Sequence, residues 1–362
     1  MTDISKSKNK KDIDKLVDFG KQLFSGILRS RTGSLSEMAK LLRFQPGTKG
    51  FHRMLEKLSD LSDELRQIYY ETIKKFLSEK GLRIGIIDDS SIEKSGKNFP
   101  KQQKHHNHTT NSFYSGMKML STQVYQAGKI ATISSKLVGK NDNKLDVANE
   151  DINILINDFV VDIILFDSWY CKSKVLEKIQ EHNKIFISRL RANSIVKLGD
   201  DTKVSLNELI KSVHHKQYMQ IKISKKSYWI FESTLDFKTY GTLRVIVSKE
   251  GQHKEPIFLI TNSKNFSARF IVKLYSRRFN IEVFFKDAKQ FLNLKTFQCR
   301  HELKWKLHLQ LVNILHWAMQ KKNSISKIVR KIRDNTQRCL LFINENKLIN
   351  KIFDELKRRC QT

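Results

Sequence analysis

The sequence has few of the residues that bend, cross-link or anchor a chain. Its 362 residues include only three prolines and four cysteines, and no two cysteines form a CxxC pair. We therefore expect free thiols, as in a reducing cytoplasm, and no zinc site. No run of about 18 apolar residues occurs, which argues against a membrane-spanning helix. The first residues lack the apolar centre of a signal peptide, so we expect no secretory leader.

Acidic residues are scarce beside basic ones. Lysine and arginine total 67 against 37 aspartates and glutamates, and the resulting formal net charge of +30 is spread along the chain. A protein with this charge binds a polyanion favourably, because each neutralised phosphate releases a counterion. The charge therefore predicts a nucleic-acid partner, and the alternative is a basic surface that only faces solvent.

Apolar residues recur at helical spacing over positions 11–80. Two short helices are expected on either side of residues 45–47, with Arg43, Lys49, His52 and Arg53 near the turn. This arrangement resembles a helix-turn-helix, in which the second helix contacts DNA. An ordinary helical hairpin is the alternative interpretation.

From position 81 the pattern changes to short apolar runs. The runs at 84–87 and 161–166 are typical of buried strands, and each is followed directly by an aspartate, Asp88 or Asp167. The order over 81–193 is strand, strand, strand, helix, strand, helix, strand. This order is typical of a ribonuclease-H-like core, in which helices flank a mixed sheet.

The whole chain is therefore predicted to be an α/β protein with a ribonuclease-H-like catalytic core. Four more strand-like runs predict a β-rich insertion before the last core helix. The expected regions are a helical N-terminal DNA-binding region at 1–80, the core at 81–193 and 263–300, the insertion at 194–262, and a basic helical C-terminal region at 301–362.

Asp88 and Asp167 are candidates for a metal site. Strands that lie side by side and parallel would bring the two carboxylates together, and like charges at one place repel unless a cation neutralises them. Mg²⁺ prefers oxygen ligands and retains water and phosphate in its shell. Two such ions promote in-line phosphoryl displacement. Taken singly, an aspartate in this position is more often a turn former or a helix cap.

A polar stripe is expected on the last core helix, from about 266 to 292. Tyr275, Arg278, Glu282 and Lys289 have offsets of 0, 3, 7 and 14 residues. At 3.6 residues per turn they fall within a sector of roughly 60°. Glu282 could complete a three-carboxylate site, with the other three side chains holding phosphates beside it. The alternative is a solvated face without chemistry.

These residues resemble the DDE transposases of bacterial insertion sequences. The similarity rests on residues 87–90, on residues 166–170 and on the Tyr-Arg-Glu-Lys signature, which defines one cut-and-paste family. Over about 81–300 the chain is similar to that family's ribonuclease-H-like core with its β-rich insertion. Members bind terminal inverted repeats, cleave and join DNA strands with divalent metals, and in some cases pass through a DNA hairpin.

The resemblance implies a set of roles for this chain. Asp88, Asp167 and Glu282 would be the catalytic residues and would hold two Mg²⁺ ions, for which Mn²⁺ can substitute. The DNA phosphates near the cut would be contacted by Tyr275, Arg278 and Lys289. The partners would be double-stranded DNA of the element ends and target, and a second copy of the chain in a synaptic homodimer. No membrane is involved, and the place of action would be the nucleoid of a bacterial cytoplasm.

Two departures from the family pattern affect these assignments. The first family motif is usually Asp-x-Thr, whereas this chain has Asp88-Asp89-Ser90, so Asp89 is the alternative first ligand. Phe279 follows Arg278 where the family often has tryptophan. Two other functions also stay open, a nuclease built on the same core and an inactive DNA-binding relative.

Residues 101–108 combine lysines with His105, His106 and His108. No matching cluster of cysteine or histidine accompanies them. We therefore expect a basic loop that faces DNA, with a zinc site as the alternative.

Overall fold

The structure is a computed structural model that describes residues 10–361 except 46, 78–79, 108–110, 199–201, 224, 252–253 and 321–324. All four cysteines are free, as expected, and three of them are buried. Among the described residues, no helix is long and apolar enough to cross a membrane.

The central part of a twelve-stranded mixed sheet has the strand order β4-β3-β1-β5-β6. Its strands are β1 (Ile84–Glu93), β3 (Ser112–Gln126), β4 (Lys129–Val138), β5 (Ile163–Phe166) and β6 (Ile185–Leu190). β3 is antiparallel to both of its neighbours in this order, β4 and β1, whereas β1, β5 and β6 run parallel to one another. β5 is buried along its whole length, which explains its uninterrupted apolar sequence. This arrangement confirms the predicted ribonuclease-H-like core.

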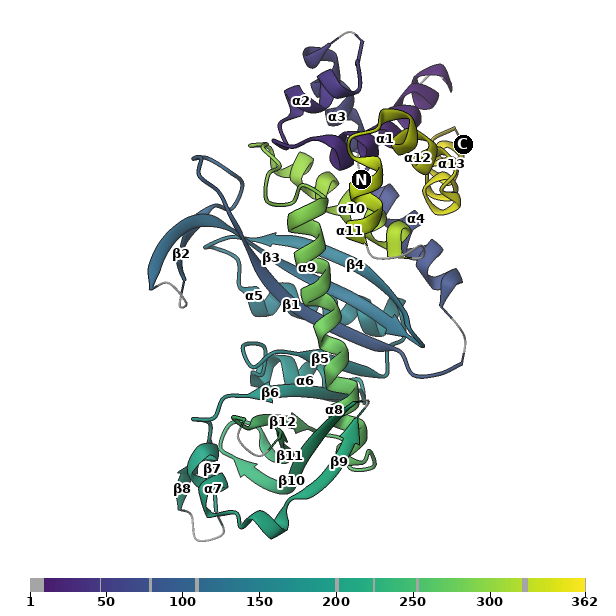
Figure 1. The fold of residues 1–362 in the computed structure, drawn as a ribbon. Coiled ribbons are helices and arrows are strands. Elements are labelled where there is room, and N and C mark those ends of the chain that lie inside the picture. The colour runs from purple at the N-terminus through teal and green to yellow at the C-terminus, as the bar shows by residue number, and fades with distance from the viewer. Residues whose placement is uncertain are drawn as a thin grey trace.

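Helices cover both faces of this core. One face carries α5 (Lys144–Asn153), which continues as a π-helix (Ile154–Asp158), and α6 (Ser173–Glu181). The other face carries α9 (Phe279–Phe291) against β1 and β3, and α10 (Glu302–Gln320) against β4. In Figure 1, α9 crosses in front of the sheet, from the helical layer down towards the insertion.

The predicted β-rich insertion is present and extends the same sheet. Its elements are β7 (Ile195–Lys197), β8 (Lys203–Ser205), α7 (Leu206–Ser212), a 3-10 turn (His215–Gln217), β9 (Met219–Ile223), β10 (Lys226–Phe237), β11 (Gly241–Glu250) and β12 (Ile257–Thr261). β12 pairs antiparallel with β6, from Phe258 opposite Leu190 to Thr261 opposite Ile187. Insertion and core are therefore joined by a continuous hydrogen-bond ladder.

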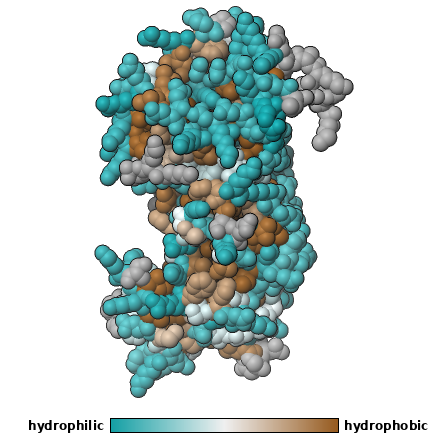
Figure 2. All heavy atoms as spheres, turned by 90° about the vertical axis from the view of Figure 1, so that its right-hand side faces the viewer, coloured by the Kyte–Doolittle hydropathy of each residue, from teal (hydrophilic) through white to brown (hydrophobic). Residues whose placement is uncertain are grey.

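Helices from both ends of the chain form one layer above the sheet. They are α1 (Lys10–Arg29), α2 (Leu35–Leu41), α3 (Thr48–Ser59), α4 (Ser62–Phe76), α11 (Ile325–Ile332), α12 (Thr336–Asn344) and α13 (Lys347–Gln361). α13 packs against α1 and α4, so the first and last helices of the described chain lie side by side (Figure 1). Gly20 permits this packing, because a Cβ there would collide with the ring of Phe353. Seen from the side, the molecule narrows between this layer and the insertion (Figure 2).

Three predicted details are wrong. β1 does not end at Asp88 but continues to Glu93. The reason is that β3 pairs with it along its entire length and provides backbone hydrogen-bond partners for its polar second half. Residues 103–107 are not a loop but a strand, β2 (Gln103–Asn107), which pairs with the start of β3. His108 lies outside the described residues.

The third wrong detail concerns the last core helix. It is divided into α8 (Ala268–Tyr275), a 3-10 turn (Ser276–Arg278) and α9. Because a 3-10 turn winds more tightly than an α-helix, the angles between side chains on either side of it differ from those of one uniform helix.

Candidate active site

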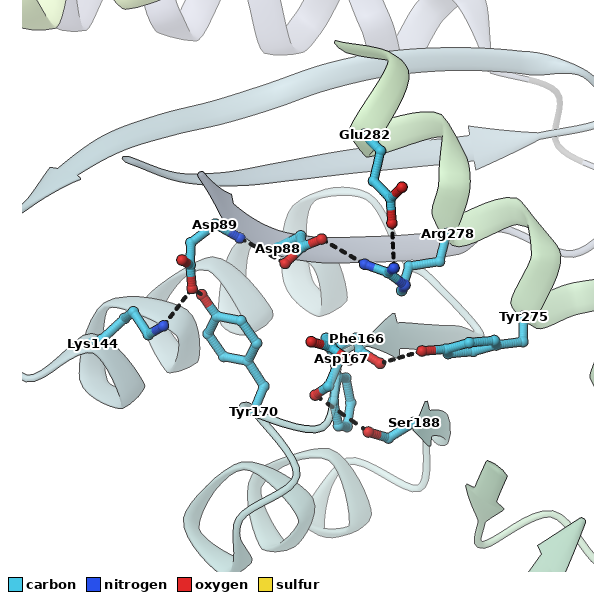
Figure 3. A network of polar contacts seen from close by, with 10 residues as sticks. All are labelled: Asp88, Asp89, Lys144, Phe166, Asp167, Tyr170, Ser188, Tyr275, Arg278 and Glu282. Carbon is cyan, nitrogen blue, oxygen red and sulfur yellow. Dashed lines mark hydrogen bonds and ion pairs between the residues drawn. The ribbon is translucent and has the colours of Figure 1, made fainter. Parts of the chain in front are cut away.

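Asp88 and Asp167 lie where two parallel strands diverge. The last paired residues of β1 and β5 are Ile87 and Phe166, and each aspartate is the next residue in its chain. β1 continues along β3, whereas the chain after β5 turns away, with the Tyr170 amide donating to the Asp167 carbonyl at 3.0 Å. The divergence leaves an opening that both aspartates line, and Figure 3 shows the two residues near each other. The register of β1 and β5 thus brings the two aspartates close together, as the apolar runs predicted.

α9 crosses this opening and closes one side of a cleft of about 430 Å³. Side chains from β1, from the turn after β5 and from α9 line it: Asp88, Asp89, Ser90, Asp167, Arg278, Glu282, Phe285, Lys286 and Lys289. The three predicted acids, which are far apart in sequence, therefore face one cleft. Lys286 was missed at the sequence level, although it lies one helical turn after Glu282 and its spacing could have revealed it.

Arg278 connects two of the acids. One terminal nitrogen donates to Asp88 Oδ2 at 2.5 Å, and the other donates to Glu282. Burial raises the pKa of Asp88 to about 6, even though the nearby Arg278 guanidinium acts to lower it. Burial thus outweighs the Arg278 ion pair and disfavours the charged form of Asp88.

Asp89 has a different environment. It forms an ion pair with Lys144 of α5, accepts a hydrogen bond of 2.6 Å from the Tyr170 hydroxyl, and lies 3.6 Å from the Lys118 ammonium. Burial acts to raise the pKa of Asp89, but these partners, led by Lys144, lower it overall. The Lys144 ammonium also lies 3.2 Å from the centroid of the Trp169 ring, a cation–π contact.

This network joins β1 to the turn that follows β5. Tyr170 belongs to the turn that carries Asp167, and Asp89 is the neighbour of Asp88, so their hydrogen bond links both candidate ligands (Figure 3). Lys144 and Lys118 were not among the site residues predicted from the sequence. No local sequence pattern marks either lysine as a site residue, because α5 and β3 bring them here only through the tertiary fold.

The remaining members of the polar stripe differ in their contacts. Lys289 donates to Ser90 Oγ at 2.7 Å, inside the cleft, and burial followed by repulsion from Lys295 lowers the pKa of Lys289. The Tyr275 hydroxyl lies 3.5 Å from the Phe166 carbonyl oxygen, beside the cleft, and burial raises its pKa. Tyr275 thus reaches β5, whereas Arg278, at the end of the 3-10 turn, reaches β1.

The donor set suits a hard divalent cation. Asp88, Asp167 and Glu282 offer carboxylate oxygens, the ligands that Mg²⁺ and Mn²⁺ prefer. In the described part of the chain, however, no three acidic, histidine or cysteine side chains are already arranged as a metal group. The Arg278 guanidinium lies between Asp88 and Glu282 and supplies positive charge there. The chemistry of the site thus fits a cation, with the guanidinium standing in for it.

Comparisons with known proteins place the chain in a family. No curated protein matches its sequence. Among solved structures, it is similar to the NurA nuclease from Sulfolobus solfataricus, with a TM-score of 0.29 and 9% identity over 61% of this chain and 82% of that one. The model of the family described as transposase DDE domain matches residues 79–318, about two thirds of the chain. That match includes the whole cleft, and the chain belongs to the transposase DDE domain family.

Proposed function

We propose that this chain is a cut-and-paste transposase of the group with the Tyr-Arg-Glu-Lys signature. It binds the terminal inverted repeats of a bacterial insertion sequence, cleaves DNA at the element ends and joins the freed ends to a target. The observation that carries the proposal is the convergence of Asp88, Asp167 and Glu282 on one cleft from three separate segments. Membership of the transposase family supports DNA as the substrate.

Two Mg²⁺ ions, or Mn²⁺ in their place, would activate the attacking oxygen and stabilise the leaving oxygen when bound by these three carboxylates. Asp88 rather than Asp89 is assigned as the first ligand. Asp89 already has two cationic neighbours and a tyrosine hydroxyl, whereas Asp88 shares a single guanidinium with Glu282.

The basic side chains of the cleft would position the DNA. Arg278 must leave at least one of its carboxylates before that carboxylate binds a cation. A guanidinium freed in this way would lie beside the scissile phosphate, and its planar N–H groups match phosphate oxygens. Lys289, held by Ser90, would add a second phosphate contact, and Tyr275 a third at the β5 side. Positioning and charge neutralisation would then account for most of the catalysis.

The other regions have proposed roles as well. The region 1–80 would contribute to DNA binding, and the core at 81–193 and 263–300 would carry out the chemistry in the bacterial nucleoid. The insertion at 194–262 and the basic region at 301–362 complete the assembly. Two element ends must be held together, which favours a homodimer of this chain in the synaptic complex.

The test uses Asp88→Asn, Asp167→Asn and Glu282→Gln, with Glu150→Gln on the exposed side of α5 as the matched control. The substrate is a plasmid that carries the gene with its flanking DNA. Each cleft variant should bind this DNA but lose Mg²⁺-dependent cleavage by about 10³-fold or more, equivalent to about 4 kcal/mol of barrier. The control should cleave normally.

Two results would contradict the proposal. Near-normal cleavage by any one cleft variant would remove that residue from the ligand set. Cleavage by the wild type without joined products would favour a nuclease on the same core over a transposase.

A further inference from the structure

A large groove lies between the helical layer and the end of β1. It has a volume of about 1250 Å³. Its walls are formed by residues between 32 and 36 and by His52 from the helical layer, by residues 93–99 after β1, and by residues 295–301 after α9. The proposed chemistry does not use this groove.

The groove lies near the active cleft. A smaller hollow of about 420 Å³ lies between them and shares Lys289 with the cleft and Thr296 with the groove. The three spaces thus follow one another along α9 and the segment after it, on a path from the cleft to the groove.

Cationic side chains dominate the far part of this path. Lys295, Arg300 and His301 are exposed at the groove, and Glu93 is its one acidic lining residue among those described. Lys295 lies 3.6 Å from the Glu93 carboxylate, whereas Arg300 and His301 form no ion pair within the described part of the chain. Burial lowers the pKa of His52, and so do the positive charges of Lys304 and His301. The local electrostatics therefore favour an anion.

We propose that this groove binds the phosphate backbone of duplex DNA on one side of the cleavage site. The inference rests on the proposed function, because it places the scissile phosphate in the cleft. Asp88 and Glu93 are five residues apart on β1, or about 17 Å at about 3.3 Å per residue. At 3.4 Å per base pair, the contacted phosphates lie about five base pairs from the cut. Phosphate contacts of this kind set the register of the DNA without reading its sequence.

The test compares two double variants that each remove two charges. Lys295→Gln with Arg300→Gln alters the groove, and Lys75→Gln with Lys351→Gln removes exposed lysines of α4 and α13. Binding to a fluorescent 30-base-pair duplex is measured in EDTA over a range of salt concentrations. Each lost phosphate contact lowers the slope of log affinity against log salt by about 0.9. We expect a decrease of about 2 for the groove variant and none for the control. Equal slopes for the two variants overturn the proposal, and so does a wild type that does not bind the duplex.

A second measurement tests the distance. Neutral methylphosphonates are placed singly along the DNA that flanks the bond cut by the wild type. Substitutions about five base pairs from that bond should weaken wild-type binding and leave binding by the groove variant unchanged. A loss that is the same in both proteins, or one confined to phosphates next to the cut, contradicts the groove assignment.

The failure of this inference is distinct from the failure of the proposed function. Asp88→Asn should retain the wild-type salt slope, because it alters the cleft and not the groove. One outcome is a smaller salt slope in the groove variant than in the control variant, together with a wild type that never cleaves DNA. In that case the groove is a DNA site and the proposed chemistry is wrong. If the wild type cleaves and the slopes are equal, the chemistry stands and the groove assignment fails.

Discussion

Asp88 and Asp89 are neighbours on one strand, yet their surroundings shift their pKa values in opposite directions. Adjacent side chains of a strand point to opposite faces, so the two carboxylates meet different partners. Asp89 is surrounded by Lys144, Lys118 and the Tyr170 hydroxyl, and its pKa is lowered. Asp88 shares one guanidinium with Glu282, and burial raises its pKa to about 6.

The difference supports the proposed division of roles, in which Asp89 stabilises the fold and Asp88 is a metal ligand. Asp89 has its charge balanced within the protein and ties the Asp167 turn to β1 through Tyr170. Asp88 retains an unfavourable electrostatic environment that an added cation would relieve. Such local destabilisation is common where a site must bind a substrate or a metal. Four predictions test this contrast, from the largest expected effect to the smallest.

The largest contrast should appear in DNA cleavage. Asp88→Asn should reduce Mg²⁺-dependent cleavage by about 10³-fold or more, because it removes a ligand. Asp89→Asn should reduce it by less than about tenfold, because the ligand set remains and only its support weakens. Single-turnover cleavage rates measure both. A larger loss in Asp89→Asn than in Asp88→Asn would reverse the ligand assignment.

Stability at pH 7 should change in opposite directions. Asp89→Asn should lower the free energy of unfolding by about 3 kcal/mol, because the buried Lys144 loses its counter-ion. Asp88→Asn should raise it by about 1–3 kcal/mol, because it removes a charge that burial disfavours. Urea denaturation followed by circular dichroism gives both values, with Glu150→Gln as the control. Destabilisation of similar size in both variants would mean that Asp88 is also structural.

The pH dependence of stability should differ in the same way. The folded pKa of Asp88, about 6, exceeds its ordinary value of 3.8, so the folded state retains a proton that the unfolded state releases. This group therefore makes stability fall as pH rises from about 4 to 6, by up to about 3 kcal/mol. The pKa of Asp89 is lowered, so its contribution is present above pH 3.8 and is lost at more acid pH. Denaturation between pH 4 and 7 should show the decline in the wild type and not in Asp88→Asn.

The smallest effect concerns metal affinity without DNA. Arg278→Met should increase Mn²⁺ affinity by about tenfold, because the guanidinium no longer competes for Asp88 and Glu282. Arg277→Met is the matched control, since that guanidinium lies over the Tyr125 ring instead. Mn²⁺ titration followed by electron paramagnetic resonance measures both. Equal affinities in the two variants would show that Arg278 does not compete with the metal.

The sequence predicted the elements that carry the three acids but not all of their surroundings. Asp167 could be located because a buried parallel strand has an uninterrupted apolar run, and Glu282 because helical spacing is regular. The ion pair of Lys144 with Asp89 joins residues 55 positions apart. Local periodicity contains no information about such a contact. The 3-10 turn before α9 was missed for a similar reason, since residues 276–278 include no proline or glycine to mark it.

The pairing of β12 with β6 has a consequence for the catalytic sheet. An unpaired strand presents free amide and carbonyl groups that invite another chain to add to it. β6 would be such an edge, directly beside the strand that leads to Asp167, and β12 covers it. β12 thus keeps the β6 edge of the core sheet from being open to pairing with another chain.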